Sequence, residues 1–166
     1  MASRTRLGFG NSSINDISTP QNLYLDLNEE FHFDFDPCPL GWKELIPYID
    51  FIDGLKSEWG ERNFVNPPFG EVKKWLEKGV TESKKGKLCV FLIPARVANK
   101  PWFEFIWPFA SEVRFLPPIR FPGYKTKTPF GLAVIIFKGE KREKRFLHPL
   151  TLSGIDYVAV TNLKEY

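Results

Sequence analysis

The apolar run at residues 88–93, stopped by Pro94, constrains the fold more than any other segment. A strand that is apolar on both faces is typical of the centre of a parallel sheet covered by helices on both sides. Before it, residues 72–80 carry apolar side chains at helical spacing, and Gly86 can end that helix. The apolar segment at residues 63–65 comes earlier still. We therefore predict a strand, a helix and a second strand that together form a right-handed βαβ unit.

The same alternation extends over most of the chain. Thr19 can cap a helix whose first residue is Pro20 and which ends near residue 30. The pattern predicts further strands at 31–36, 49–54, 112–116 and 132–137, and helical turns at 42–48 and 101–107. We predict an α/β fold with a mostly parallel sheet and helices on both faces. Residues 1–17 are predicted to be a flexible arm, and residues 18–166 a single domain.

Composition excludes several classes of protein. The chain has 166 residues, 43% of them hydrophobic, which suits one globular domain. Two Cys and two His residues make a disulfide framework or a zinc site an unfavourable interpretation, and we expect no metal. No apolar run approaches the ~18 residues needed to span a bilayer, and no signal peptide is visible. The net charge of +3 permits a polyanionic partner without requiring one.

The stretch Asn66-Pro67-Pro68-Phe69 follows the predicted strand at 63–65 and is the strongest functional signal. The two prolines stiffen the backbone and leave its carbonyl groups available as acceptors. Asn66 adds a side-chain carbonyl group, and Phe69 adds a flat apolar face. Acceptors beside a stacking ring suit a planar group that carries an amino function, such as a nucleobase. Asn-Pro also forms ordinary turns, but the combination and its position favour function.

Four candidate residues follow predicted strands. They are Asp36, Asp53, Asn66 and Pro94. Because ligands of open α/β sheets bind beyond the carboxyl ends of the strands, we expect these residues to surround one site.

Ordered motifs across the chain resemble one enzyme family. They are Thr19-Pro20, Asp36-Pro37-Cys38-Pro39, Asp53-Gly54-Leu55, Trp59, Asn66-Pro67-Pro68-Phe69, Trp75, Leu92-Ile93-Pro94-Ala95-Arg96, Trp102-Phe103 and Pro129-Phe130-Gly131. Together they are similar to the phage-type adenine-N6 DNA methyltransferases, small Dam-related proteins that use S-adenosylmethionine. The resemblance runs from about residue 18 to residue 137. It implies a Rossmann-like methyltransferase fold, DNA as partner, and the cytoplasm of a bacterial or phage-infected cell as location.

The resemblance also implies catalytic roles for Asn66, Pro67, Pro68 and Phe69, which match the family's Asp/Asn-Pro-Pro-Tyr/Phe motif. The Asn66 side-chain oxygen and the Pro67 carbonyl group are expected to accept hydrogen bonds from the target amino group. They hold its lone pair toward the methyl carbon for direct, in-line transfer without a covalent enzyme intermediate. Phe69 is expected to stack on an adenine flipped out of the duplex.

For the cofactor, the resemblance implies contacts from Thr19, Pro20, Asp36, Pro37, Cys38 and Asp53. Two departures from the family pattern stand out. The usual glycine-rich turn is replaced by Cys38-Pro39-Leu40-Gly41, and the acid expected on the ribose hydroxyl groups is not assigned, Asp50 being a guess.

Basic residues predict the nucleic-acid contacts. Arg96, Arg114, Arg120, Lys125 and Lys127 lie near the motifs or in the surface segment at 120–130, and are candidates for phosphate contact. The basic run at 138–145 is interpreted as a solvated turn. No separate target-recognition domain is visible, so we expect short or loose sequence selectivity.

Two alternative functions remain open at this level. The same loop occurs in methyltransferases that act on cytosine N4, RNA guanine or protein glutamine. A non-catalytic nucleic-acid-binding module with the same fold is the other alternative, suggested by the altered turn at Cys38-Pro39. Target sequence, strand preference, oligomeric state and biological role are not indicated by the sequence.

Overall fold

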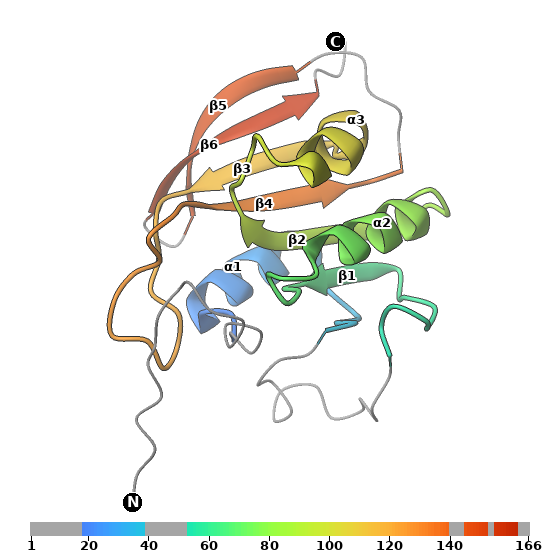
Figure 1. The fold of residues 1–166 in the computed structure, drawn as a ribbon, viewed down its shortest axis with the longest axis horizontal. Helices are drawn as coiled ribbons and strands as arrows, with labels where there is room; N and C mark the ends of the chain where they lie inside the picture. Colours follow the sequence, from blue (N-terminus) through green and yellow to red (C-terminus); the bar gives the residue numbers. More distant parts are fainter. Residues whose placement is uncertain (1–17, 39–52, 140–144, 153–154, 163–166) are drawn as a thin grey trace, which may run out of the picture.

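The computed structural model describes residues 18–38, 53–139, 145–152 and 155–162. Six strands form one sheet in the order β1-β2-β4-β3-β6-β5 (Figure 1). In chain order the elements are α1 (Gln21–Phe31), β1 (Arg62–Val65), α2 (Val72–Ser83), β2 (Leu88–Pro94), the π-helix η1 (Trp102–Ile106), α3 (Trp107–Phe109), β3 (Glu112–Leu116), β4 (Leu132–Phe137), β5 (Arg145–Leu152) and β6 (Ile155–Asn162). The α/β prediction is confirmed.

The sheet is mixed, so the prediction of a mostly parallel sheet is wrong. β1 and β2 are parallel and are joined through α2, which confirms that they form a βαβ unit. β4 is antiparallel to both of its neighbours, β2 and β3, and the pairs β3–β6 and β5–β6 are antiparallel as well. The apolar content of β4 reveals burial on both faces but carries no information about direction. β1, β2 and β3 nevertheless point the same way, because β4 alone reverses between them.

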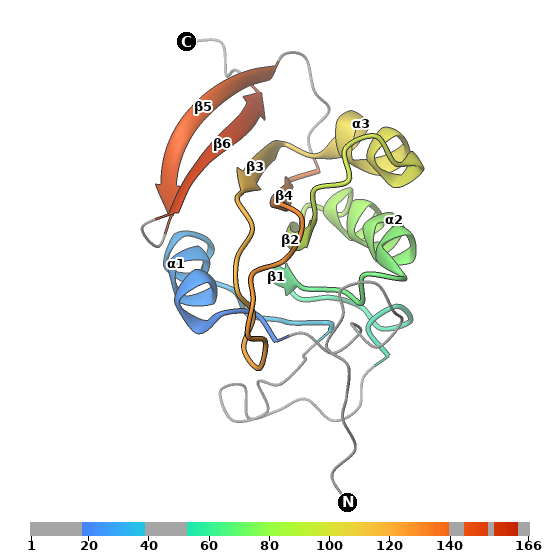
Figure 2. The same cartoon turned by 60° about the vertical axis from the view of Figure 1, so that its left-hand side comes forward.

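Helices cover both faces of the sheet, as predicted (Figure 2). On one face, Phe91 and Ile93 of β2 pack in a core that includes side chains of α2 and η1. On the other face, Val90 and Leu92 pack in a core that includes side chains of α1. The period-two geometry of a strand therefore divides one apolar run between two cores.

α2 confirms the strongest helical pattern of the sequence. Its buried side includes Trp75, Leu76, Gly79 and Val80, the positions predicted to face the sheet. A Cβ atom at Gly79 would collide with the ring of Phe91, so glycine allows the helix to approach β2 closely. Gly86 follows the helix with φ at 94°, a conformation that suits glycine.

The first helix differs from its prediction at both ends. It begins at Gln21, Pro20 precedes it, and no side chain caps its amino end, so the predicted capping role of Thr19 is wrong. It extends to Phe31, and His32 follows in the left-handed conformation.

The predicted strand at 31–36 is reduced to one isolated bridge, in which Phe35 pairs in parallel with Asn63 of β1. The helix takes the first residue of that segment, and only its end reaches the sheet.

Strands β2, β3 and β4 lie where the sequence predicts them, and η1 with α3 occupies the predicted helix at 101–107. The hairpin of β5 and β6 was not predicted. Its sequence signal is uneven: residues 155–162 are rich in β-branched residues and follow Ser153-Gly154, a pair typical of turns, whereas residues 145–152 contain Pro149 and few β-branched residues. The predicted arm at 1–17, the turns at 42–48 and most of the strand at 49–54 lie outside the described residues, as does much of the basic run at 138–145.

Candidate active site

One edge of the sheet collects the predicted site residues. Asn66 follows β1 directly, and Pro94 ends β2. Asp36 follows Phe35, which pairs in parallel with β1. Because these three segments run in the same direction, the three residues lie at the carboxyl edge of the sheet, where the segment between β3 and β4 also lies (Figure 1).

The catalytic candidate Asn66 contacts a residue far away in the sequence. Its Nδ2 atom donates a hydrogen bond to Oγ1 of Thr19 at 3.1 Å. Asn66 is 4% exposed and Thr19 is 2% exposed, so the bond is buried. Thr19 was predicted to lie near the cofactor and Asn66 at the target base, and the structure joins the two side chains by a hydrogen bond.

Asp36 is a buried acid. It is 4% exposed, and its Oδ1 atom accepts a hydrogen bond from the backbone N–H of Cys38 at 2.8 Å. Burial raises the pKa of Asp36 from 3.8 to about 7, against the opposing effect of the Cys38 hydrogen bond. Within the described residues Asp36 forms no salt bridge. Such a carboxyl group is suited to a cationic partner.

Asp53 lies beside the Asp36 segment but faces solvent. A Cβ atom at Gly54 would collide with the carbonyl oxygen of Pro37, so the two segments are in close contact. The Asp53 carboxylate pairs with Lys56 at 2.9 Å, and this hydrogen bond lowers the pKa of Asp53. The backbone segments that carry Asp53 and Asp36 are therefore neighbours, whereas the Asp53 carboxylate forms a salt bridge with Lys56. Asp50 lies outside the described residues.

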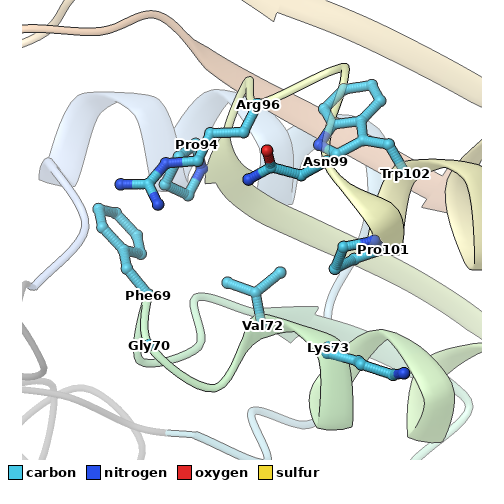
Figure 3. A pocket seen from close by; sticks show the side chains of 9 residues that line it. All are labelled: Phe69, Gly70, Val72, Lys73, Pro94, Arg96, Asn99, Pro101 and Trp102. Atoms are coloured by element: carbon cyan, nitrogen blue, oxygen red, sulfur yellow. The ribbon is translucent and has the colours of Figure 1, made fainter.

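Phe69 stands between an aromatic cluster and a pocket. Its ring makes edge contacts with Phe121 and Phe130, with ring centroids 6.3 and 6.2 Å apart. It also lines a pocket of about 140 Å³ (Figure 3). The other lining residues come from the turn before α2 and its first residues, and from the end of β2 to the start of η1; they are Gly70, Val72, Lys73, Pro94, Arg96, Asn99, Pro101 and Trp102. The ring at the end of the motif is therefore accessible from a cavity.

The pocket combines apolar walls with a few polar groups. Figure 3 shows the Arg96 guanidinium group near the ring of Phe69, and the carboxamide of Asn99 between Arg96 and Trp102. Arg96 also lies over the ring of Phe130, 5.8 Å from its centroid. Lys73 and Asn99 were not predicted as site residues. Their only signal is their proximity in sequence to the motif and to the end of β2.

The proposed DNA contacts fall into two groups. Arg96, Arg120, Lys125 and Lys127 are exposed. Arg114, in contrast, is 5% exposed and forms salt bridges with Glu30 of α1 and Glu112 of β3. Burial lowers the pKa of Arg114, but these bonds outweigh it and raise the pKa overall. The prediction that Arg114 contacts phosphate is therefore wrong, because its charge is neutralised inside the fold.

The basic segment between β3 and β4 is anchored at several points. Ile119, Phe121 and Thr128 are buried, and the N–H of Thr128 donates to the carbonyl group of Ile119 at 2.8 Å. The hydroxyl group of Thr128 donates to the carbonyl group of Phe130 at 2.6 Å. The exposed basic residues of this segment thus lie on a backbone that is held in place by buried side chains and hydrogen bonds.

Among the described residues, membrane-spanning helices and metal-binding clusters are both absent. No helix in this part of the chain is long and apolar enough to cross a membrane. No group of three or more His, Cys, Asp and Glu side chains in the same ranges is arranged to hold a metal ion.

The fold and the loop define an α/β protein whose carboxyl sheet edge carries a buried asparagine, two prolines and an aromatic ring that lines a pocket. A sequence model of the DNA N-6-adenine-methyltransferase (Dam) family matches residues 11–143, most of the chain. The chain therefore belongs to this family of adenine-specific DNA methyltransferases, which use S-adenosylmethionine. The predicted family and reaction, methylation of adenine N6 in DNA, are confirmed. Comparisons with curated proteins and with solved structures give no match.

Proposed function

We propose that this chain transfers the methyl group to adenine at the loop Asn66-Pro67-Pro68-Phe69. One observation carries the proposal. The loop begins at the carboxyl end of β1 with a buried carboxamide and ends with an aromatic ring that lines a pocket. Acceptors and a stacking surface thus belong to the same four residues, which is the combination that an exocyclic amino group on a planar base requires.

Asn66 and Pro67 hold the reacting nitrogen. The Asn66 Oδ1 atom and the Pro67 carbonyl oxygen accept hydrogen bonds from the two hydrogens of the adenine amino group. These bonds orient the nitrogen lone pair and stabilise the positive charge that develops as the nitrogen is methylated. Because both residues are buried, the acceptors act in a region of low dielectric constant where such hydrogen bonds are strong.

Phe69 and the pocket support a base taken out of the duplex. An aromatic side chain stacks on any base, and the stacking energy offsets part of the cost of unpairing. In the structure the Phe69 ring makes edge contacts with Phe121 and Phe130, so its position is fixed by packing. Its accessible side lines the pocket. This arrangement supports stacking of the target adenine on Phe69.

The cofactor-side residues fit S-adenosylmethionine on chemical grounds. The cofactor supplies the methyl group from a positively charged sulfonium centre. Asp36 is a buried carboxyl group without a salt bridge among the described residues, and burial raises its pKa to about 7, which supports a cation as its partner. We propose that Asp36, Pro37 and Cys38 hold the cofactor together with Thr19-Pro20. Asp53 is proposed to contribute only if it releases Lys56.

Arg96, Arg120, Lys125 and Lys127 are proposed to contact DNA phosphates. All four are exposed, three lie on the anchored segment between β3 and β4, and Arg96 borders the pocket. Contacts of this kind raise affinity without reading sequence.

The fold is proposed to be Rossmann-like over residues 18–166, as a single domain. The βαβ unit of β1, α2 and β2, the helices on both faces and the site at the carboxyl edge support this. β6 pairs with β3, so the C-terminal hairpin extends the same sheet.

Product analysis tests the proposed reaction. Purified protein is incubated with S-adenosylmethionine and with unmethylated DNA of mixed sequence, and the nucleosides are identified by mass spectrometry after digestion. We expect N6-methyladenine in DNA. Methylation of cytosine alone, or no methylated nucleoside from folded protein that binds S-adenosylmethionine, would overturn the assignment.

A further inference from the structure

We propose that Asn99 contacts the target base, because its carboxamide nitrogen can donate a hydrogen bond to a ring nitrogen of the flipped adenine. The inference rests on the proposed function, in which the adenine stacks on Phe69. Asn99 and Phe69 line the same pocket, and Figure 3 shows the Asn99 carboxamide between Arg96 and Trp102. The contact makes Asn99 a base-recognition residue on the wall of the pocket that faces away from the loop.

The chemistry of adenine calls for a donor in this pocket. In the proposed function, Asn66 and Pro67 bind the amino group, and Phe69 covers one face of the ring. Outside the amino group, the polar atoms on the edges of adenine are the ring nitrogens N1, N3 and N7, which only accept hydrogen bonds. An acceptor that leaves water and finds no donor costs free energy. A ring nitrogen that is turned into the pocket therefore needs a donor there.

Asn99 is the polar residue of the pocket that offers an uncharged donor. The Lys73 ammonium group pairs with Glu104, with a nitrogen–oxygen distance of 3.0 Å. The Arg96 guanidinium group lies over the ring of Phe130, and its charge suits a phosphate better than an uncharged base. The Asn99 side chain is exposed, and among the described residues it forms no hydrogen bond or ion pair. Its donor can therefore exchange water for the base.

The local sequence explains why this carboxamide is not used within the fold. Asn99 directly precedes the helical residues that begin at Lys100, a position where asparagine commonly caps a helix by bonding to the N–H group of the second or third helical residue. The second residue is Pro101, which has no N–H group. The third is Trp102, whose N–H group donates to the main-chain carbonyl group of Asn99 at 2.9 Å. No local donor is thus left for the side chain of Asn99.

The main chain of Asn99 is held in place on both sides. Its N–H group donates to the carbonyl group of Arg96 at 2.9 Å, and its own carbonyl group accepts the bond from Trp102. Trp102 is 2% exposed and stacks on Phe115 of β3, with ring centroids 5.9 Å apart. Because the backbone is already fixed, a bond to the base orders little more than one side chain.

Two substitutions test which end of the amide acts. Asn99→Ala removes the bond, and we expect kcat/KM for DNA to fall roughly tenfold, the usual effect of one neutral hydrogen bond. Asn99→Asp keeps the shape but has only acceptors, so its carboxylate would face the lone pair of the ring nitrogen. We expect an equal or larger loss for Asn99→Asp. The Kd for S-adenosylmethionine is expected to stay within about twofold in both variants.

Base analogues identify the acceptor. The target site is mapped from the methylated adenines, and duplexes are made with 1-deaza-, 3-deaza- or 7-deazaadenine at that site, each of which replaces one ring nitrogen by C–H. The readout is the loss in kcat/KM caused by an analogue with wild type, divided by the loss with Asn99→Ala. This ratio cancels any change in the reactivity or pairing of the base itself. We expect a ratio of roughly ten for one analogue and within about twofold of one for the others.

A matched control and a second background keep the test independent of folding. Asn22 is exposed and belongs to α1, which packs on the opposite face of the sheet from η1. Asn22→Ala is expected to leave kcat/KM and all analogue effects unchanged. If Asn99→Ala does not fold, Asn99→Asp replaces it, because aspartate and asparagine suit the position before a helix about equally. In Asn99→Asp, the analogue that lacks the contacted nitrogen should recover part of the rate, since the repulsion is removed.

The outcomes separate this inference from the proposed function. If Asn99→Ala keeps the wild-type kcat/KM, or if no analogue effect depends on Asn99, the base contact is wrong and the proposed function stands. Full activity of Asn99→Asp also contradicts the inference, because a carboxylate cannot donate. A loss seen only as weaker, less salt-dependent DNA binding would make Asn99 a phosphate contact instead. Full activity of Asn66→Ala would overturn the proposed function itself.

Discussion

At the scale of single residues, the site depends on buried polar groups at the end of apolar strands. The Asn66 amide nitrogen donates a hydrogen bond to the Thr19 hydroxyl group. The Asp36 carboxyl group accepts one hydrogen bond, from the backbone N–H of Cys38, and this bond does not offset the rise in its pKa caused by burial. Such a group lowers the stability of the free protein and favours a cationic ligand. The cost in stability is what the proposed role of Asp36 in cofactor binding predicts, since functional residues commonly lower stability.

The cost of burying the Asp36 carboxyl group should make the stability of the free protein depend on pH. The pKa of Asp36 is about 7 in the folded chain and near 3.8 when exposed, so the folded state binds more protons between these values. The contribution of Asp36 to stability therefore falls as pH rises from about 4 to about 7, and stays low above that. Asp36→Asn is expected to be more stable than the wild type at pH 8, by on the order of 1–4 kcal/mol. Near pH 4 the difference should vanish.

Chemical denaturation at several pH values measures this difference. Asp53→Asn serves as the control, because Asp53 is exposed and its pKa is lowered by Lys56. It should give no gain in stability at pH 8. A gain for Asp36→Asn that is independent of pH would show that the buried carboxyl group does not titrate as described.

At the scale of elements, α1 is joined to the sheet by packing and by charge. The Arg114 guanidinium group lies over the ring of Phe31, 5.2 Å from its centroid, and pairs with Glu30 of α1 and Glu112 of β3. Thr19, which bonds to Asn66, lies two residues before α1, so this connection involves the helix next to the candidate site.

Two arginines should therefore behave in opposite ways. Arg114→Leu leaves two acids without their partner and is expected to lower the free energy of unfolding by about 2 kcal/mol. We expect less than for a fully buried pair, since the side chain of Glu30 is 43% exposed. The exposed Arg120, replaced by Gln, should leave stability unchanged. It should weaken DNA binding and lower the slope of log affinity against log salt by about one.

Chemical denaturation of both variants measures the predicted difference in stability. DNA binding at several salt concentrations measures the predicted difference in the salt slope. If Arg114→Leu folds normally and instead reduces the salt slope, Arg114 contacts phosphate after all.

Sequence patterns predicted elements better than they predicted their arrangement. α2 and β2 carry unbroken periodic signals, and their ends lie close to the predicted positions. Apolar content made β4 recognisable as a strand, but strand direction depends on pairing partners distant in sequence. Thr19 was predicted to cap a helix because local rules favour it, whereas a tertiary hydrogen bond to Asn66 takes its hydroxyl group. The β5–β6 hairpin was missed because the sequence of β5 contains a proline and few β-branched residues, so its strand signal is weak.

At the scale of the whole molecule, the sheet explains how separate motifs form one site. Asp36, Asn66 and Pro94 are far apart in the sequence, and parallel alignment of their segments brings them to one edge. Position at this edge was predictable from the motifs, since strand ends in α/β sheets carry ligand sites. The bond between Thr19 and Asn66 and the pocket residue Asn99 were not predictable, because no local pattern encodes such contacts.

Asn66 is proposed to hold the target amino group while contributing little to the fold or to cofactor binding. Incorporation of labelled methyl groups into adenine of unmethylated DNA, compared between wild type and Asn66→Ala, tests it most directly. Circular dichroism and calorimetric titration with S-adenosylmethionine accompany the assay. We expect Asn66→Ala to fold, to bind S-adenosylmethionine with a Kd within about threefold of wild type, and to lose at least about 100-fold in methylation rate. A folded, cofactor-binding Asn66→Ala that methylates adenine at the wild-type rate would contradict the account.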